Sequence, residues 1–279
     1  MEDVQNHPDG RRIALDRVGV ADLRYPIVVL DRDHQKQHTV AVLSMSVNLP
    51  HEFKGTHMSR FIEILNRHRG EITMRTLPAL LRELRAKLNA ESAHVEARFP
   101  YFIERKAPVS GAAALMDYEC SFNAVTNGAT DNFVFGVRVP VTSLCPCSKA
   151  ISDYGAHNQR GYITILVRTA RDGQGNYRMV WFEELIDIGE RSASAPVYPL
   201  LKRADERHVT MQAFDNPVFV EDMVRNVTTA LQSDERIDWF SVYALNHESI
   251  HNHGAFASVQ WERSSSREKP DGAWIAAHA

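Results

Sequence analysis

Cysteine is scarce in this chain of 279 residues, in which only Cys120, Cys145 and Cys147 occur. Three cysteines are too few for the disulfide framework of a small secreted domain. The first residues, MEDVQNHPDGRR, lack the apolar stretch of a secretory signal. No apolar run approaches the roughly 18 residues that a transmembrane helix needs. We therefore expect a globular, cytoplasmic protein with no membrane partner.

An excess of charge of one sign is also missing, because 32 basic residues face 35 acidic ones and leave a formal net charge of -3. Binding to nucleic acid rewards a basic excess, so we expect no nucleic-acid partner. Hydrophobic residues make up 44% of the chain, which excludes intrinsic disorder and supplies a sizeable core. The length suits one large domain or two of about 100–150 residues each.

Hydrophobic periodicity predicts an alternation of strand pairs and helices. A period of two residues indicates a half-buried strand, whereas apolar residues at i, i+3, i+4 and i+7 indicate a helix. In the first half, the expected strands are 25–30, 44–49, 95–99 and 116–124, and the expected helices are 57–69, ended by Gly70, and 77–88. In the second half, the expected strands are 133–141, 162–167, 239–245 and 255–261, and the expected helices are 181–188, 199–211 and 217–231. Asn216 and Pro217 suit the N-cap and the first position of the last helix.

The order of these elements predicts an α+β fold built from a duplicated antiparallel unit, although no short sequence repeat marks the duplication. We expect a flexible leader (1–22), two modules (23–129 and 130–263) and a flexible tail (264–279). An open sheet with helices on one face leaves its edges and its other face unprotected. We therefore expect a homo-oligomer in which several sheets close into a barrel.

The polar segment 142–161 between two expected strands carries much of the candidate chemistry. Its sequence CPCSK contains Cys145 and Cys147, and Lys149 nearby favours a thiolate. Because His157 lies in the same segment, one interpretation is a metal site with a thiolate ligand, and the other is a pair of small buried cysteines at a strand end. The following residues, His157–Arg160, are either a solvated loop, or Gln159 and Arg160 hold an anion or another polar ligand beside the metal.

Two helical segments contain carboxylates that allow two interpretations each. Glu206 lies in a run of mixed charge, where it is either the partner of Lys202 in a solvent-facing ion pair or an oxygen ligand for a metal. Glu221 is either the ion-pair partner of Arg225 or a carboxylate that points into a pocket. In a pocket, such a carboxylate can accept two parallel N–H bonds from a guanine-type ring.

The segment NHESIHNH (246–253) joins two expected strands and holds three histidines and a glutamate. Polar hairpin loops are common, so a simple turn is one interpretation. The other is a proton-transfer cluster, because histidines and a carboxylate are the groups that move protons near neutral pH. If the segment is locally extended, His251 and His253 project to the same side.

Taken together, these segments resemble the type IB GTP cyclohydrolases. The matching pieces are GTHMSRF (55–61), CPCSK (145–149), YGAHNQRG (154–161), PVYPLLKRADE (196–206), PVFVED (217–222) and NHESIHNH (246–253), in order over most of the chain. The resemblance implies the tunnelling fold, with two ββαα-type modules per subunit, and a homotetramer with active sites at subunit interfaces. It also implies the conversion of GTP and water into 7,8-dihydroneopterin triphosphate and formate, the first step of tetrahydrofolate biosynthesis.

The same resemblance assigns roles to individual residues. It implies one divalent metal per site, zinc, manganese or ferrous iron, held by Cys145, His157 and Glu206 with one position left open. It also makes Glu221 the carboxylate that anchors the purine ring. The acid–base group is then Glu248, His251 and His253, with Cys145 as a further catalytic residue, and the candidates for holding the triphosphate are Lys149, Arg160, Lys202, Arg203 and Arg225. Cys147 receives a supporting or redox-sensitive role, and His57, Ser59 and Arg60 are expected to contribute across an interface.

Two other functions remain as alternatives. One is the NADPH-dependent nitrile reductase of queuosine synthesis, which shares the tunnelling fold, but its glutamate–serine–lysine nicotinamide motif is absent between the two halves. The other is a purine- or metal-binding protein without turnover. The titrating cluster 246–253 argues against simple binding, which needs no proton transfer.

Overall fold

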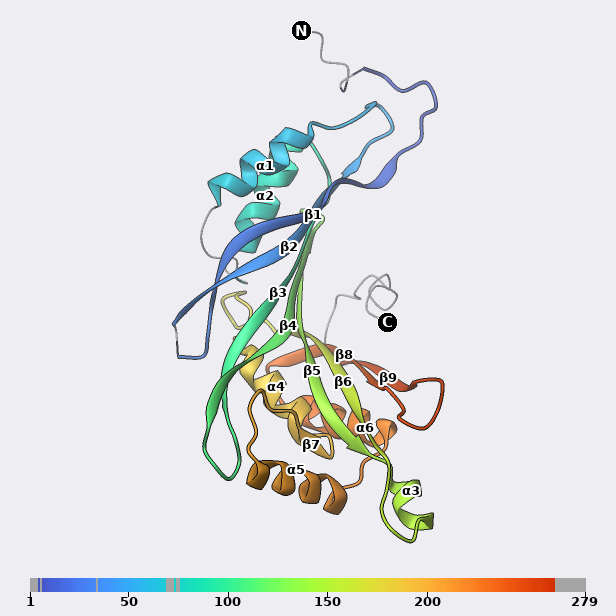
Figure 1. The fold of residues 1–279 in the computed structure, drawn as a ribbon. Helices are drawn as coiled ribbons and strands as arrows, with labels where there is room; N and C mark the ends of the chain where they lie inside the picture. Colours follow the sequence, from blue (N-terminus) through green and yellow to red (C-terminus); the bar gives the residue numbers. More distant parts are fainter. Residues whose placement is uncertain (1–4, 6, 34, 69–72, 74–75, 264–279) are drawn as a thin grey trace.

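One long antiparallel sheet runs through both halves of the molecule (Figure 1). In the computed structural model, which describes residues 5, 7–33, 35–68, 73 and 76–263, the strands follow the order β1-β2-β3-β4-β5-β6-β8-β9, with the short β7 paired to β5. The strands are β1 (Leu15–Leu30), β2 (Lys36–Leu49), β3 (Ala93–Lys106), β4 (Ala113–Thr126), β5 (Asp131–Leu144), β6 (Asn158–Thr169), β7 (Ala195–Pro196), β8 (Ile237–Asn246) and β9 (Ala255–Glu262). The helices are α1 (Met58–Arg67), α2 (Leu77–Leu88), α3 (Pro146–Ile151), α4 (Phe182–Arg191), α5 (Arg203–Asp215) and α6 (Val220–Ser233). The chain is therefore α+β, as predicted.

The helices are inserted at equivalent points of the two halves. Helices α1 and α2 lie between β2 and β3, and α4, α5 and α6 lie between β6 and β8. Helix α2 packs on β3 and β4, whereas α4 packs on β5, and α6 on β8 and β9. Figure 1 shows the first pair of helices at the β1–β2 end and the other three beside the second half of the sheet. The expected module boundary at 129/130 falls in the turn between β4 and β5 and stays a prediction.

The hydrophobic core runs across the turn between β4 and β5 without a break, because buried residues of β1 to β6 and of β8 belong to one cluster. At its centre, the ring of Phe182 at the start of α4 is 6% exposed. Its centroid lies 5.9 Å from that of Phe99, 5.6 Å from Tyr101, 5.4 Å from Phe122 and 5.6 Å from Phe135. Since these rings come from β3, β4 and β5, a helix of the second half holds strands of the first half in place.

Most expected elements are found, and some bounds are as predicted. Helix α2 spans Leu77–Leu88, the predicted range, and α1 ends at Arg67, two residues before the predicted end. The expected cap Gly70 and the expected tail 264–279 lie outside the described residues. None of the described helices has the length and apolar composition needed to cross a bilayer.

The expected leader was too long, because β1 begins at Leu15 rather than near Tyr25. The first part of this strand pairs only with β2, and its register shifts between Leu15 and Val18 and again between Val20 and Leu23. Most of its side chains there are at least partly exposed. A bulged edge strand of this kind has no regular apolar alternation, so its period could not be recognised.

Two further predictions were wrong, one at the start of α6 and one in the segment 142–161. Helix α6 begins at Val220 with Phe219 as its N-cap, whereas Asn216 ends α5 and donates its side-chain N–H to the carbonyl of Ala193 at 3.0 Å. The expected loop 142–161 also contains structure, because β5 extends to Leu144, α3 follows, and β6 begins at Asn158. At Asn216 a tertiary hydrogen bond overrode the local signal, and in the segment 142–161 the pairing of β6 with β5 extends both strands beyond their apolar residues.

Candidate functional site

The end of β5 brings Cys145 next to His157 through main-chain contacts. The amide of Cys145 donates to the carbonyl of His157 at 3.1 Å, and the amide of His157 donates to Oγ of Ser148 at 3.2 Å. Cys145 is also the N-cap of α3, where Sγ accepts the amide of Ser148 at 3.4 Å and Pro146 takes the first helical position. The thiol and the imidazole are therefore held at neighbouring ends of one short loop. All three cysteines of the chain are free, and Cys147 is exposed.

The imidazole of His157 faces the predicted acid–base segment. Its Nδ1 lies 2.9 Å from Oε1 of Gln159 and 3.9 Å from a carboxylate oxygen of Glu248, whose side chain is 13% exposed. The ring of His251 stands edge-on to that of His157, with 6.3 Å between centroids, and the ring of His253 stacks on His251 at 5.2 Å. The pairing of β6 with β8 causes this meeting, because it places the segment after β8 beside the start of β6.

Glu206, the third expected metal ligand, is not brought to that pair within the chain. It is exposed on the first turn of α5. Within the described part of the chain, no three histidine, cysteine, aspartate or glutamate side chains form a group that could hold a metal ion. The donor chemistry of Cys145 and His157 fits a borderline-soft divalent metal, since a thiolate and an imidazole are its preferred ligands. Glu206, the expected oxygen ligand, is not part of such a group.

Asp205, next to Glu206, has a structural environment that the sequence did not reveal. Its side chain is fully buried and accepts the amides of Val109 and Ser110 at 2.8 Å each, the hydroxyl of Ser110 at 2.6 Å and the amide of Lys202 at 2.9 Å. Burial raises the pKa of this carboxyl, but the hydrogen bonds from Ser110, Lys202 and Val109 outweigh it and hold the pKa well below its usual range. Asp205 thus ties the β3–β4 hairpin to the start of α5.

Glu221 lies on the exposed first turn of α6, and the start of that helix is anchored beside the end of β5. The amide of Val218 donates to the carbonyl of Leu144 at 3.2 Å, and the carbonyl of Val218 accepts Oγ of Ser143 at 3.1 Å. The considered ion pair of Glu221 with Arg225 does not form, because Arg225 pairs with Asp222 at 2.8 Å. The carboxylate of Glu221 is therefore accessible from solvent.

Of the residues expected to hold the triphosphate, Lys149 is engaged with another part of the chain, and Arg160, Lys202 and Arg203 are exposed. Lys149 donates to the carbonyl of Phe214 and lies 4.2 Å from the centroid of its ring, so its ammonium is engaged with the end of α5. Arg160 on β6 is exposed, and so are Lys202 and Arg203 at the start of α5, where Lys202 is the N-cap rather than an ion-pair partner of the next turn. The residues expected to act across an interface, His57, Ser59 and Arg60, lie at α1, in the other half of the sheet (Figure 1).

The sequence analysis singled out Gln159 as a candidate ligand holder, but it did not predict that this side chain belongs to a buried polar group beneath the strand ends. Ser143 is 1% exposed, Gln159 7% and Asn246 3%. Gln159 and Asn246 both donate to Oγ of Ser143, at 3.4 and 3.1 Å. A signal was present, because each residue continues the inward period of its strand, after apolar residues such as Val141 on β5 or Ala244 on β8. A polar residue at an inward position needs a buried partner.

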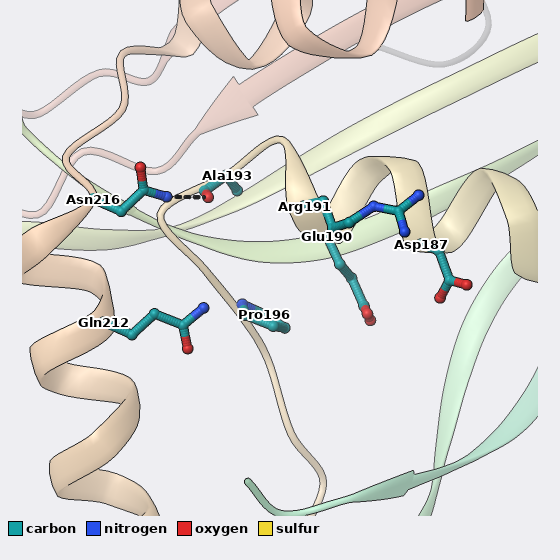
Figure 2. Close-up of a pocket in the computed structure, with 7 residues that line it drawn as sticks. All are labelled: Asp187, Glu190, Arg191, Ala193, Pro196, Gln212 and Asn216. Atoms are coloured by element: carbon teal, nitrogen blue, oxygen red, sulfur yellow. Dashed lines mark hydrogen bonds between the residues drawn. The ribbon is translucent and has the colours of Figure 1, made fainter. Parts of the chain in front are cut away.

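A cavity of about 430 Å³ lies apart from these groups. Figure 2 shows its lining from α4, the β7 segment and α5: Asp187, Glu190, Arg191, Ala193, Pro196, Gln212 and Asn216. Burial raises the pKa of Glu190, although the hydroxyl of Tyr118 donates to this carboxyl at 2.6 Å and Arg105 lies 3.0 Å from it. None of the residues predicted to bind metal or substrate lines the cavity.

Comparisons with known proteins identify the relatives of the chain. Residues 1–257 match the family model described as type I GTP cyclohydrolase FolE2. The GTP cyclohydrolase FolE2 of Pelobacter propionicus is 53% identical over 264 residues, 94% of this chain and 99% of that protein. The GTP cyclohydrolase FolE2 of Geobacter sulfurreducens is 54% identical over 263 residues, again 94% of this chain and 99% of that protein.

Solved structures show the fold alone, because their sequences are distant. The uricase of Arthrobacter globiformis superposes with a TM-score of 0.55 at 10% identity, over 91% of this chain and 96% of that one. A uricase from Bacillus fastidious gives a TM-score of 0.53 at 9% identity, over 88% and 92% of the two chains. These neighbours are of tunnelling-fold type, which agrees with the large antiparallel sheet.

Proposed function

The chain belongs to the type I GTP cyclohydrolase FolE2 family, and we propose that its reaction takes place where β5, β6 and β8 end. As a GTP cyclohydrolase, it opens the purine ring of GTP and forms 7,8-dihydroneopterin triphosphate and formate at the start of folate biosynthesis. The observation that carries the location is the meeting of His157, which precedes β6, with Glu248 and His251, which lie in the loop between β8 and β9.

We assign the metal to Cys145 and His157, with Glu206 as the third ligand. The main-chain contact between the first two residues supports their joint role. The exposed carboxylate of Glu206 is accessible to a neighbouring copy, which suits a site at a subunit interface. A divalent zinc, manganese or iron ion, one per site, supplies Lewis acidity toward water when bound.

The purine is held and protonated by side chains of this chain. Glu221 accepts the ring N–H and the exocyclic amine of guanine, because an ionised carboxylate offers two acceptors side by side. His251 or His253 donates a proton at N7, which makes C8 more electrophilic toward water, and Glu248 completes this acid–base group. A positioned proton donor of this kind contributes about 10²–10⁴ in rate. The exposed cations Arg160, Lys202 and Arg203 neutralise the triphosphate, together with Lys149 once GTP displaces its contact with α5.

The assembly is proposed as a homotetramer that closes the sheet into a barrel. Strands β1 and β9 are the outer strands of the described sheet, and unpaired edges of this length favour pairing with another chain. In such an assembly, residues near α1 such as His57 reach the site of a neighbour. Sedimentation equilibrium should give four times the mass of the chain, and a monomer with full activity would contradict this arrangement. We also propose a cytoplasmic location, which the free cysteines and the GTP substrate support.

The function is tested by incubating the metal-reconstituted full chain with GTP. We expect formate release in equal amount with a product that fluoresces as neopterin after oxidation. Oxidation of NADPH in the presence of a nitrile substrate would instead support the nitrile reductase, which the named relatives do not favour. Binding of GTP with no product at any pH would support a binding protein without turnover.

A further inference from the structure

The buried hydrogen bonds of Ser143 include one to a main-chain carbonyl, which can act only as an acceptor. The carbonyl of Val218 can only accept, so Ser143, whose Oγ lies 3.1 Å away, must donate its hydroxyl proton to it. A serine hydroxyl has one proton. Toward its other neighbours, Oγ of Ser143 can therefore only accept.

Those neighbours are two side-chain amides, and the rule sets their orientation. Asn246 lies 3.1 Å and Gln159 3.4 Å from Oγ of Ser143. Each must present its NH₂ group there, since two oxygens facing each other without a proton repel. An amide has one nitrogen and one oxygen, so Oε1 of Gln159 points the other way, to Nδ1 of His157 at 2.9 Å.

Because Oε1 of Gln159 is an acceptor, the nitrogen that faces it must carry a proton. We infer that Gln159 locks His157 in the tautomer with hydrogen on Nδ1, which leaves the lone pair of Nε2 for a ligand. Glu248 does not compete, because its carboxylate lies 3.9 Å from Nδ1, beyond hydrogen-bond distance. Gln159 is thus a positioning residue.

The consequence for metal binding rests on the proposed function. A histidine ligates through the nitrogen that has no proton, and a partner that holds the other N–H fixes both the tautomer and the orientation of the ring. The same chain of hydrogen bonds ends at Val218, directly ahead of the helix that carries Glu221.

Gly161 is part of the same arrangement. A Cβ added to it would lie 2.4 Å from Oδ1 of Asn246. This oxygen has no hydrogen-bond partner in the described part of the chain, which agrees with the orientation that turns its NH₂ group to Ser143. The absence of a side chain at Gly161 leaves room for this amide.

The experiment compares the full chain with Gln159→Met, which keeps the size but removes the acceptor, and with Gln159→Glu, which keeps the acceptor toward Nδ1 of His157 but loses the N–H donor to Ser143. Nitrogen-15 spectra of histidine-labelled, metal-free protein at about pH 8, where an ordinary histidine is neutral, report the tautomer directly. His157→Gln identifies the signals by their loss. We expect a protonated Nδ1 and an unprotonated Nε2 in the parent and in Gln159→Glu, and a loss of this preference in Gln159→Met.

The second readout is the affinity for Zn²⁺ or Mn²⁺ alone, measured by competition with a chromophoric chelator. Gln159→Met should weaken binding about 10- to 100-fold, whereas Gln159→Glu should stay within a few-fold of the parent. The exposed neighbour Asn158→Ala is the matched control and should change neither readout. A proton on Nε2 in the parent, or unchanged spectra in Gln159→Met, would overturn the inference. If His157→Gln binds metal like the parent, the metal assignment fails, while the spectra still decide the tautomer.

Discussion

Replacing Ser143 by alanine should destabilise the protein through the polar groups that it leaves behind. The hydroxyl of Ser143 donates to the carbonyl of Val218 and accepts from the amides of Gln159 and Asn246. Ser143 is 1% exposed. Each buried polar group that loses its partner costs about 1–3 kcal/mol. Gln159 can shift, because its contact is already long, so we count the other two groups. The expected loss is about 2–6 kcal/mol, a large part of the stability of a typical domain.

Urea denaturation at fixed protein concentration, followed by tryptophan fluorescence, measures this loss. The m-value should stay the same, so that the midpoint reports stability alone. Ser241→Ala is the matched control, because this serine is half-buried on β8 and its hydroxyl makes no hydrogen bond with the described residues. It should change the free energy of unfolding by no more than about 0.5 kcal/mol. A Ser143→Ala protein as stable as the control would refute the buried hydrogen-bond chain.

Three further predictions concern the substrate anchor, the start of α5 and the core. Glu221→Gln should lower kcat/KM for GTP about 10- to 100-fold in steady-state assays, because one charged acceptor is lost, and an unchanged value would show that the anchor is elsewhere. Glu206→Gln should lower the bound metal measured by atomic absorption without a change in melting temperature, whereas Asp205→Asn should lower the melting temperature because it removes an acceptor for buried donors. If instead Asp205→Asn lost metal and Glu206→Gln lowered the melting temperature, Asp205 would be the metal ligand and Glu206 the structural residue. Phe182→Ala should cost about 3–5 kcal/mol and leave a single unfolding transition in calorimetry, and two separate transitions would contradict a shared core.

Local patterns were sufficient for much of the fold. Helix α2 could be predicted with its bounds, because Leu77, Leu81 and Leu84 repeat at helical spacing and are buried as expected. The start of α6 could not, because Asn216 is equally suited to cap a helix and to end one, and its contact with Ala193 decided between them. Such a contact depends on the tertiary structure and leaves no local signal.

The candidate site, too, could be predicted only as far as local patterns reach. Residue types and spacing were enough to single out Cys145, His157 and the segment 246–253, and the structure brings these together through the β6–β8 pairing. Spacing could not show that Asp205 is buried while Glu206 is exposed, since both are carboxylates in one charged run. The placement of Glu206 relative to Cys145 also depends on contacts beyond the helix that carries it.

The central claim is that Cys145 and His157 together hold the divalent metal that activates water for attack on the purine ring. The most direct measurement is formate release from GTP, with bound metal determined on the same sample, for the parent, Cys145→Ala and Cys147→Ala. We predict that Cys147→Ala keeps most of the activity and the metal, because this cysteine is exposed and is not assigned as a ligand. Cys145→Ala should lose both while its melting curve stays close to that of the parent. Normal formate release by Cys145→Ala would contradict the account.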